Sequence, residues 1–97
     1  MTLPSHVPFV YILRCADGSL YTGAARNLAR RLRQHLAGRA SRYTRARLPV
    51  ELAWSRRVRT WSRALKEEHR LKRLSRAQKL ELIEGAGATR SASAPSL

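Results

Sequence analysis

Hydrophobic residues near the start of the chain fall into two short runs whose composition is typical of strands. The first run is Phe9–Arg14 and the second is Ser19–Thr22. Both are rich in β-branched and aromatic residues, and the Asp17-Gly18 pair between them favours a tight turn. We therefore predict a β-hairpin whose second strand ends at Gly23.

The next segment shows the four-residue spacing of an amphipathic helix. Leu28, Leu32 and Leu36 define its buried stripe. Asn27 is a suitable N-cap, and Gly38 is a suitable terminator because glycine readily adopts the left-handed conformation that ends helices. We predict a helix between these two residues.

The middle of the chain predicts a loop, a strand and a second helix. Residues 39–49 are very basic and lack apolar periodicity, which indicates a loop. Residues 50–55 alternate between apolar and polar side chains, as a strand does. The helix that follows covers roughly residues 61–74 and can begin at Thr60 or Ser62.

A capping-box pattern starts the last predicted helix. Ser75 is followed three residues later by Gln78, and the apolar pattern continues to Ile83, just before Gly85. The remainder is rich in Gly, Ala and Ser, which predicts disorder. The chain therefore divides into an N-terminal extension (residues 1–7), one folded domain (8–85) and a disordered tail (86–97).

The predicted elements follow the order β-β-α-β-α-α. Because hairpin strands are antiparallel, this order predicts a small antiparallel three-stranded sheet flanked by helices, an α+β fold.

Charge narrows the class of partner. The 97 residues include 20 Lys and Arg against 6 Asp and Glu, a net charge of +14, which favours binding to a nucleic acid. No apolar run is long enough to span a membrane, and no signal peptide is evident. Cys15 is the single cysteine, which excludes an internal disulfide and a cysteine-based zinc site. We expect a soluble, cytoplasmic protein that does not bind membranes.

Five residues could carry chemistry, and each also has a simpler structural explanation. The hairpin turn brings Tyr11 and Tyr21 close together, although either could be an ordinary core tyrosine. Arg31 and His35 share one face of the first helix, at the border of its stripe. Glu68 belongs to the inward series of the second helix, where a carboxylate needs a metal ion or an ion-pair partner such as an arginine.

Four segments carry a shared pattern: Phe9-Val10-Tyr11, Tyr21-Thr22-Gly23, Asn27 to His35, and Ala64 to Lys72. In this order and spacing, together with the Leu-Ser-Arg-Ala-Gln-Lys and Glu-Gly-Ala-Gly stretches that follow, they resemble the small single-domain bacterial branch of the GIY-YIG nuclease superfamily. The resemblance covers roughly residues 8–87. The first motif keeps only its tyrosine, Ala24 replaces a lysine of the family's repair nucleases, and the asparagine that many members carry near the last helix has no clear counterpart.

The resemblance implies a metal-dependent DNA endonuclease that hydrolyses phosphodiester bonds in DNA repair or recombination. Glu68 would bind one Mg²⁺ or Mn²⁺ ion, and Arg31 would donate to the phosphate. Tyr11 or Tyr21 would position the attacking water and take its proton, with His35 assisting. The alternative is a non-catalytic nucleic-acid-binding module in which Glu68 is an ion-pair partner of Arg31.

The expected substrate is DNA, branched or single-stranded, and RNA is not excluded. Tyr43 in the basic loop is expected to be free to stack on an unpaired base. A partner protein could supply targeting. The residues expected to contact DNA are Arg26, Arg30, Arg39, Arg42, Tyr43, Arg45, Arg47 and Lys72.

Overall fold

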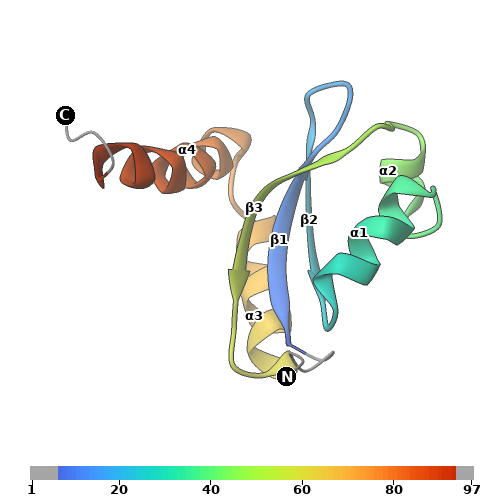
Figure 1. Cartoon of the computed structure of the whole chain (residues 1–97), viewed down its shortest axis with the longest axis horizontal. Helices are drawn as coiled ribbons and strands as arrows, with labels where there is room; N and C mark the ends of the chain where they lie inside the picture. The colour runs from blue at the N-terminus through green and yellow to red at the C-terminus, as the bar shows by residue number, and fades with distance from the viewer. Residues whose placement is uncertain (1–6, 94–97) are drawn as a thin grey trace.

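Three antiparallel strands form the centre of the computed structural model, which describes residues 7–93 of the chain and the side chains of residues 7–85. The sheet has the order β2-β1-β3 (Figure 1). The strands are β1 (Phe9–Arg14), β2 (Leu20–Ala25) and β3 (Glu51–Arg57). The helices are α1 (Leu28–Leu36), α2 (Arg42–Arg45), α3 (Trp61–Lys72) and α4 (Arg76–Ser93). The predicted α+β fold and element order are confirmed, and α2 is an extra single turn of helix within the predicted loop.

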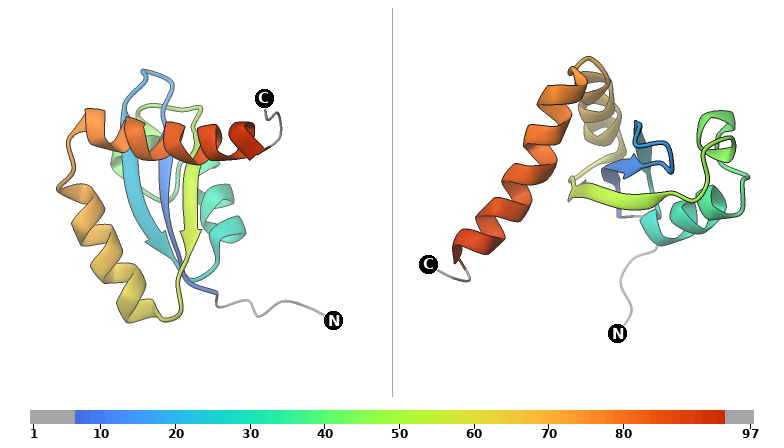
Figure 2. Two further views of the ribbon diagram at one scale, coloured as in Figure 1. Left: turned by 90° about the vertical axis from the view of Figure 1, so that its left-hand side faces the viewer. Right: turned by 90° about the horizontal axis from the view of Figure 1, so that it is seen from above.

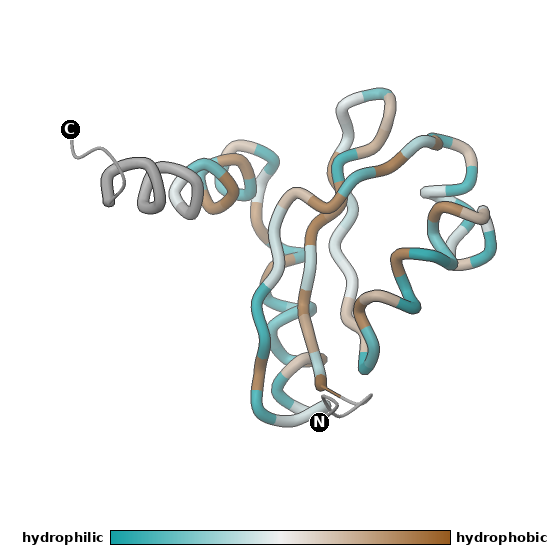
Figure 3. Tube along the Cα trace, viewed as in Figure 1, coloured by the Kyte–Doolittle hydropathy of each residue, from teal (hydrophilic) through white to brown (hydrophobic). Residues whose placement is uncertain are grey.

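The central strand β1 is buried on both faces, because helices cover the sheet from two sides. On one face Tyr11 and Leu13 pack with residues of α1. On the other face Val10 and Ile12 pack with residues of α3 and α4. Figure 2 shows the three layers, and Figure 3 shows hydrophobic positions along β1 and many hydrophilic positions on the helices.

The hairpin forms at Asp17-Gly18 as predicted. Gly18 has a φ of 85°, and the Asp17 carboxylate accepts hydrogen bonds from both the backbone N–H and the hydroxyl of Ser19, at 2.9 and 2.6 Å. However, β2 does not end at Gly23. Gly23 pairs with Tyr11, and a Cβ atom at this glycine would lie 2.5 Å from the Tyr11 hydroxyl oxygen. The glycine therefore allows a close approach and does not terminate the strand.

A bulge in β3 alters the predicted alternation of residues 50–55. The pairing of β3 with β1 shifts between Ile12 and Leu13. As a result Val50 and Trp54 pack in the clusters on opposite faces of the sheet, and Leu52 is 41% exposed. An extra residue on one strand reverses the facing of the side chains beyond it.

The helix starts follow the predicted caps. Asn27 accepts a hydrogen bond from the Arg30 N–H, and Thr60, not Ser62, caps α3. Ser75 and Gln78 form the reciprocal bonds of a capping box, at 2.9 and 3.1 Å.

The predicted end of the last helix at Ile83 is wrong, because α4 continues to Ser93. A glycine inside a helix costs about 1 kcal/mol, which weakens the helix without stopping it. The end of the predicted tail (94–97) and nearly all of the predicted extension (1–6) lie outside the described residues. Within the described part of the chain, no helix is long and apolar enough to cross a membrane.

Candidate active site

A buried histidine links three elements through hydrogen bonds. His35 on α1 is completely buried, and its Nε2 atom lies 2.9 Å from the hydroxyl of Tyr11 on β1. Its Nδ1 atom lies 2.9 Å from the hydroxyl of Thr44 on α2, which is also completely buried. The prediction that His35 borders the helix stripe is wrong, because His35 is inside the protein while Leu36 is 55% exposed.

The partners of His35 determine which of its ring nitrogens carries the proton. The Thr44 hydroxyl donates a hydrogen bond to the backbone carbonyl of Ser41, at 3.3 Å. It therefore accepts from His35, which places the imidazole proton on Nδ1. Nε2 is then the acceptor for the hydroxyl proton of Tyr11. Burial and the charge of Arg31 lower the pKa of His35, so the ring is held in its neutral form.

The five residues expected to carry chemistry are grouped around the Tyr11 hydroxyl. Burial is the main cause that raises the pKa of Tyr11 above its ordinary value, and the nearby Tyr21 and Glu68 raise it further, whereas Arg31 lowers it. Tyr21 packs its ring edge-on against His35, with the two ring centroids 5.3 Å apart. The structure thus brings side chains from β1, β2, α1 and α3 into one electrostatically coupled cluster.

Tyr43 on α2 already has partners for its ring. Tyr21 stacks against it with a centroid separation of 5.9 Å, and the Arg47 guanidinium lies 3.8 Å from its centroid. Arg47 is held in turn by Asp17, at 3.1 Å. The Tyr43 ring is therefore not free in this structure, contact of this ring with a base stays a prediction, and Arg47 packs against the hairpin turn.

Glu68 lies on the inward side of α3 as predicted, but its ion-pair partner is Lys72, at 3.2 Å, and not Arg31. Lys72, which we expected to contact DNA, therefore neutralises the carboxylate in this structure. Glu67 does not point away from the protein. Its side chain is 23% exposed, close to the 21% of Glu68, and it pairs with Arg70 and with Arg56 on β3.

The acidic, histidine and cysteine side chains of the described residues show whether a divalent metal ion can bind at Glu68. Among the described residues, no group of three or more His, Cys, Asp or Glu side chains could enclose a metal ion. Glu68 is a single, partly exposed carboxylate whose charge acts on the pKa of Tyr11. Mg²⁺ keeps several waters and is commonly held by one or two carboxylates plus substrate phosphates, so this residue fits such a site.

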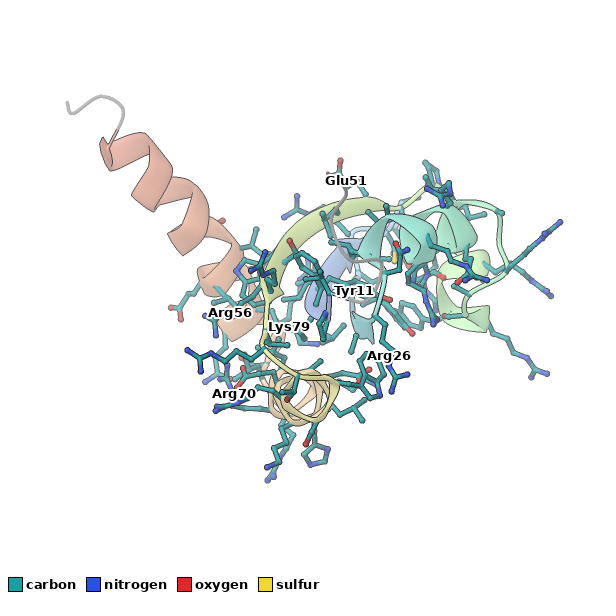
Figure 4. All side chains as sticks on the ribbon, turned by 60° about the horizontal axis from the view of Figure 1, so that its bottom comes forward. Tyr11, Arg26, Glu51, Arg56, Arg70 and Lys79 are labelled. Atoms are coloured by element: carbon teal, nitrogen blue, oxygen red, sulfur yellow. The ribbon has the colours of Figure 1, made fainter. Side chains whose placement is uncertain are left out.

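A hollow of about 520 Å³ opens beside Arg31, between the start of α1 and α3. Arg26, labelled in Figure 4, is one of the residues that line this hollow. Of the remaining arginines expected to contact DNA, Arg30, Arg39, Arg42 and Arg45 are exposed. The lining consists of Ala25, Arg26, Asn27, Arg30, Arg31, Gln34 and Trp61.

Sequence reasoning did not find three residues of this region: Ser41, Thr44 and Trp61. Ser41 caps α2 by accepting from the Thr44 N–H, and this Ser-x-x-Thr spacing could have indicated the short helix. Trp61 is the first residue of α3 and follows a basic segment, and an aromatic residue in this position could have indicated a surface contact.

Comparison with known proteins identifies the family. The GIY-YIG catalytic domain matches residues 7–81. The chain belongs to the GIY-YIG family. A UPF0213 protein of Oceanobacillus iheyensis is 49% identical over 78% of this chain and 88% of its own length. A UPF0213 protein of Natronomonas pharaonis is 48% identical over 77% of this chain and 88% of its own length.

Two solved structures of similar proteins share the fold. The solution NMR structure of a UPF0213 protein from Bacillus halodurans has a TM-score of 0.53 and 38% identity, covering 79% of this chain and 82% of that one. The solution NMR structure of a protein from E. faecalis has a TM-score of 0.57 and 33% identity, covering 84% and 88% respectively. The resemblance stated from the sequence motifs is confirmed.

Proposed function

We propose that this protein is an endonuclease that hydrolyses phosphodiester bonds in DNA with the help of one divalent metal ion. The observation that carries the proposal is the Tyr11–His35 hydrogen bond, placed within the electrostatic reach of Arg31 and Glu68. Membership of the GIY-YIG family and the net charge of +14 support a nucleic-acid substrate. Repair or recombination of DNA is the process that we propose for it.

The hydrogen-bond chain supplies a path for one proton. The attacking water forms a bond to phosphorus and gives a proton to the Tyr11 hydroxyl oxygen, while the Tyr11 hydroxyl proton passes to Nε2 of His35. The bond from phosphorus to the leaving sugar oxygen breaks, and this oxygen takes a proton from solvent. A free tyrosinate would be a high-energy species because the pKa of Tyr11 is raised, so a concerted transfer to His35 is required.

The hydrogen bond favours Tyr11 over Tyr21 as the proton carrier. Tyr21 packs against the same imidazole, so it orients the ring and borders the site. Arg31 donates to the phosphate oxygens as negative charge develops on them. When bound at Glu68, Mg²⁺ or Mn²⁺ would supply Lewis-acid stabilisation of the phosphate.

Replacing the proposed metal ligand tests the function. Glu68→Gln should lower metal-dependent cleavage by about a thousandfold or more, because Lewis-acid catalysis contributes several kcal/mol. DNA affinity measured without divalent metal should stay within a few fold, since a carboxylate makes no favourable contact with phosphate. Cleavage is measured on single-stranded, duplex, nicked and branched DNA, with Mg²⁺ and with a chelator.

Glu67→Gln is the matched control on the same helix. The two glutamates have similar exposure, but only Glu68 acts on the pKa of Tyr11. The control should cleave within about twofold of the parent rate after its folding is confirmed by thermal unfolding. Parental cleavage by Glu68→Gln would show that the metal is not held there. DNA binding without cleavage of any substrate by the parent would instead support the non-catalytic binding module.

A further inference from the structure

Trp61 belongs to two adjoining hollows on the protein surface. One is the 520 Å³ hollow that contains Arg31. The other has a volume of about 320 Å³ and is lined by Pro8, Arg26, Arg59, Thr60 and Trp61. Arg26 and Trp61 line both hollows, so the two hollows adjoin at this pair of side chains, and we refer to them together as the groove.

The groove is strongly positive. Its arginines are Arg26, Arg30, Arg31 and Arg59, and none of the described residues that line either hollow is acidic. None of these four forms an ion pair with a carboxylate of the described residues, whereas Arg47 and other arginines outside the groove do. A group of guanidinium side chains without ion-pair partners attracts a polyanion, which suits a DNA backbone bound next to Arg31.

The aromatic wall of the groove adds a second kind of contact. Trp61 is only partly buried, and the Arg26 guanidinium lies 4.7 Å from its ring centroid. A planar apolar ring inside a positive groove suits a nucleotide, whose base can stack on the indole while its phosphate pairs with arginine. Such stacking requires a base that is not paired within a duplex.

We propose, on the basis of the proposed function, that Trp61 is a stacking platform for an unpaired base next to the phosphate held by Arg31. The preferred substrate is then DNA with unpaired nucleotides at the cleavage position, such as a single strand, a flap or a branch. Arg26 covers the indole in the free protein and turns to a phosphate when a base replaces it.

Binding without divalent metal tests the platform independently of cleavage. Trp61→Ala should weaken binding of a single-stranded oligonucleotide by about ten- to a hundredfold, the usual effect of removing one stacking residue. Trp61→Phe should restore most of the affinity. Arg26→Gln should instead reduce the salt dependence by about one phosphate contact. Thermal unfolding confirms that each variant is folded.

An oligonucleotide series with single abasic sites makes the test specific to stacking. In the parent, one abasic position should weaken binding as much as Trp61→Ala does. In Trp61→Ala the same position should cause no further loss, because the stacking partner is already missing. Additive losses at every position would overturn the proposal, since they would show that Trp61 contacts no base.

Fluorescence gives a second readout. The chain has two tryptophans, so Trp54→Phe leaves Trp61 as the only one. Single-stranded DNA should quench its emission, and fully paired duplex should not. Equal responses to both would overturn the inference. Absence of cleavage together with intact quenching would overturn the proposed function and leave the stacking site standing.

Discussion

His35 can accept a proton from Tyr11 only in one of its two neutral tautomers. The tautomer is set by Thr44, which lies on the far side of the ring and is completely buried. The Thr44 hydroxyl donates to the Ser41 carbonyl, and the Nδ1–H of His35 donates to the hydroxyl oxygen. Thr44 is therefore a positioning residue that acts through His35 and does not touch DNA.

Removing this hydroxyl should change catalysis more than affinity. Thr44→Val should lower kcat by about ten- to a hundredfold, because the imidazole can then adopt the tautomer that cannot accept from Tyr11. Thr44→Ser keeps the hydroxyl and should retain most activity. ¹⁵N NMR of the His35 ring identifies the tautomer in each variant. A Thr44→Val variant with an unchanged tautomer and an unchanged kcat would contradict the hydrogen-bond chain.

The protonation of His35 determines the direction in which the cleavage rate should change with pH. The pKa of His35 lies below its ordinary value of 6.5, and the proposed proton path needs the neutral ring. The rate in parent and Thr44→Ser should therefore be fully developed above about pH 6.5 and should fall as the pH drops through the lowered pKa of His35.

At the scale of elements, β2 is an edge strand whose Gly23 leaves space for the side chain of Tyr11. Gly23 faces the Tyr11 ring, and its lack of a Cβ lets the hydroxyl reach His35. Helix α1 supplies His35, the partner of the Tyr11 hydroxyl, because residues 28, 31, 32 and 35 share the helical face that packs on the sheet. The geometry of the candidate site therefore depends on the register between β1 and β2.

Adding one methyl group at Gly23 should disturb this geometry. In Gly23→Ala the new Cβ would lie 2.5 Å from the Tyr11 hydroxyl oxygen, so the ring has to move. We expect about a hundredfold loss of cleavage and about 1–3 kcal/mol lower free energy of unfolding. In the control, Gly85→Ala, the new Cβ meets no heavy atom of the described residues within 4 Å beyond its chain neighbours and the backbone of its own helix, and helix propensity should raise stability by up to about 1 kcal/mol. Parental cleavage by Gly23→Ala would show that the Tyr11 position is not critical.

The sequence predicted these elements well where the signal was local. The Asp17-Gly18 turn, the Asn27 cap and the Ser75 capping box depend on neighbouring residues, and all three are confirmed. The features that the sequence did not predict depend on contacts between residues far apart in the chain. The β3 bulge exposes Leu52, and His35 is buried where it forms hydrogen bonds with β1 and α2. Neither effect leaves a local signal in the sequence.

For the candidate site, sequence motifs named five residues that the structure groups together, but they did not give the partners of these residues. The ion-pair partner of Glu68 is Lys72, one turn further along α3, and not an arginine, while metal binding by Glu68 stays a prediction. Thr44 was missed because α2 has only four residues and no apolar periodicity. Contacts made by such short segments depend on the whole fold.

Across the whole molecule, positive charge greatly exceeds what the acidic residues can neutralise. The chain has 20 Lys and Arg and only 6 Asp and Glu. Asp17, Glu51, Glu67 and Glu68 are each already paired with a basic side chain. Most of the arginines are therefore available for phosphate, and binding to DNA should weaken steeply with added salt.

The basic loop should account for part of this salt dependence. Replacing Arg39, Arg42 and Arg45 by glutamine should flatten the slope of log affinity against log salt by roughly two to three units on duplex DNA, at about 0.9 per phosphate. The control replaces Arg56 and Arg70, which lie on the opposite side of α3 from the groove (Figure 4), and should leave the slope unchanged. Parallel lines for the parent and the loop variant would mean that DNA follows another surface.

The single cysteine offers a way to observe motions of the layer between the sheet and α1, which holds Tyr11 and His35. Cys15 is 4% exposed and packs in the same cluster as Tyr11 and Val50, directly after β1. A thiol reagent can reach it only when the side chains packed around it separate, so the rate of modification measures the free energy of that opening. We predict that DNA bound over this layer slows the reaction, which would make Cys15 an internal reporter of DNA binding.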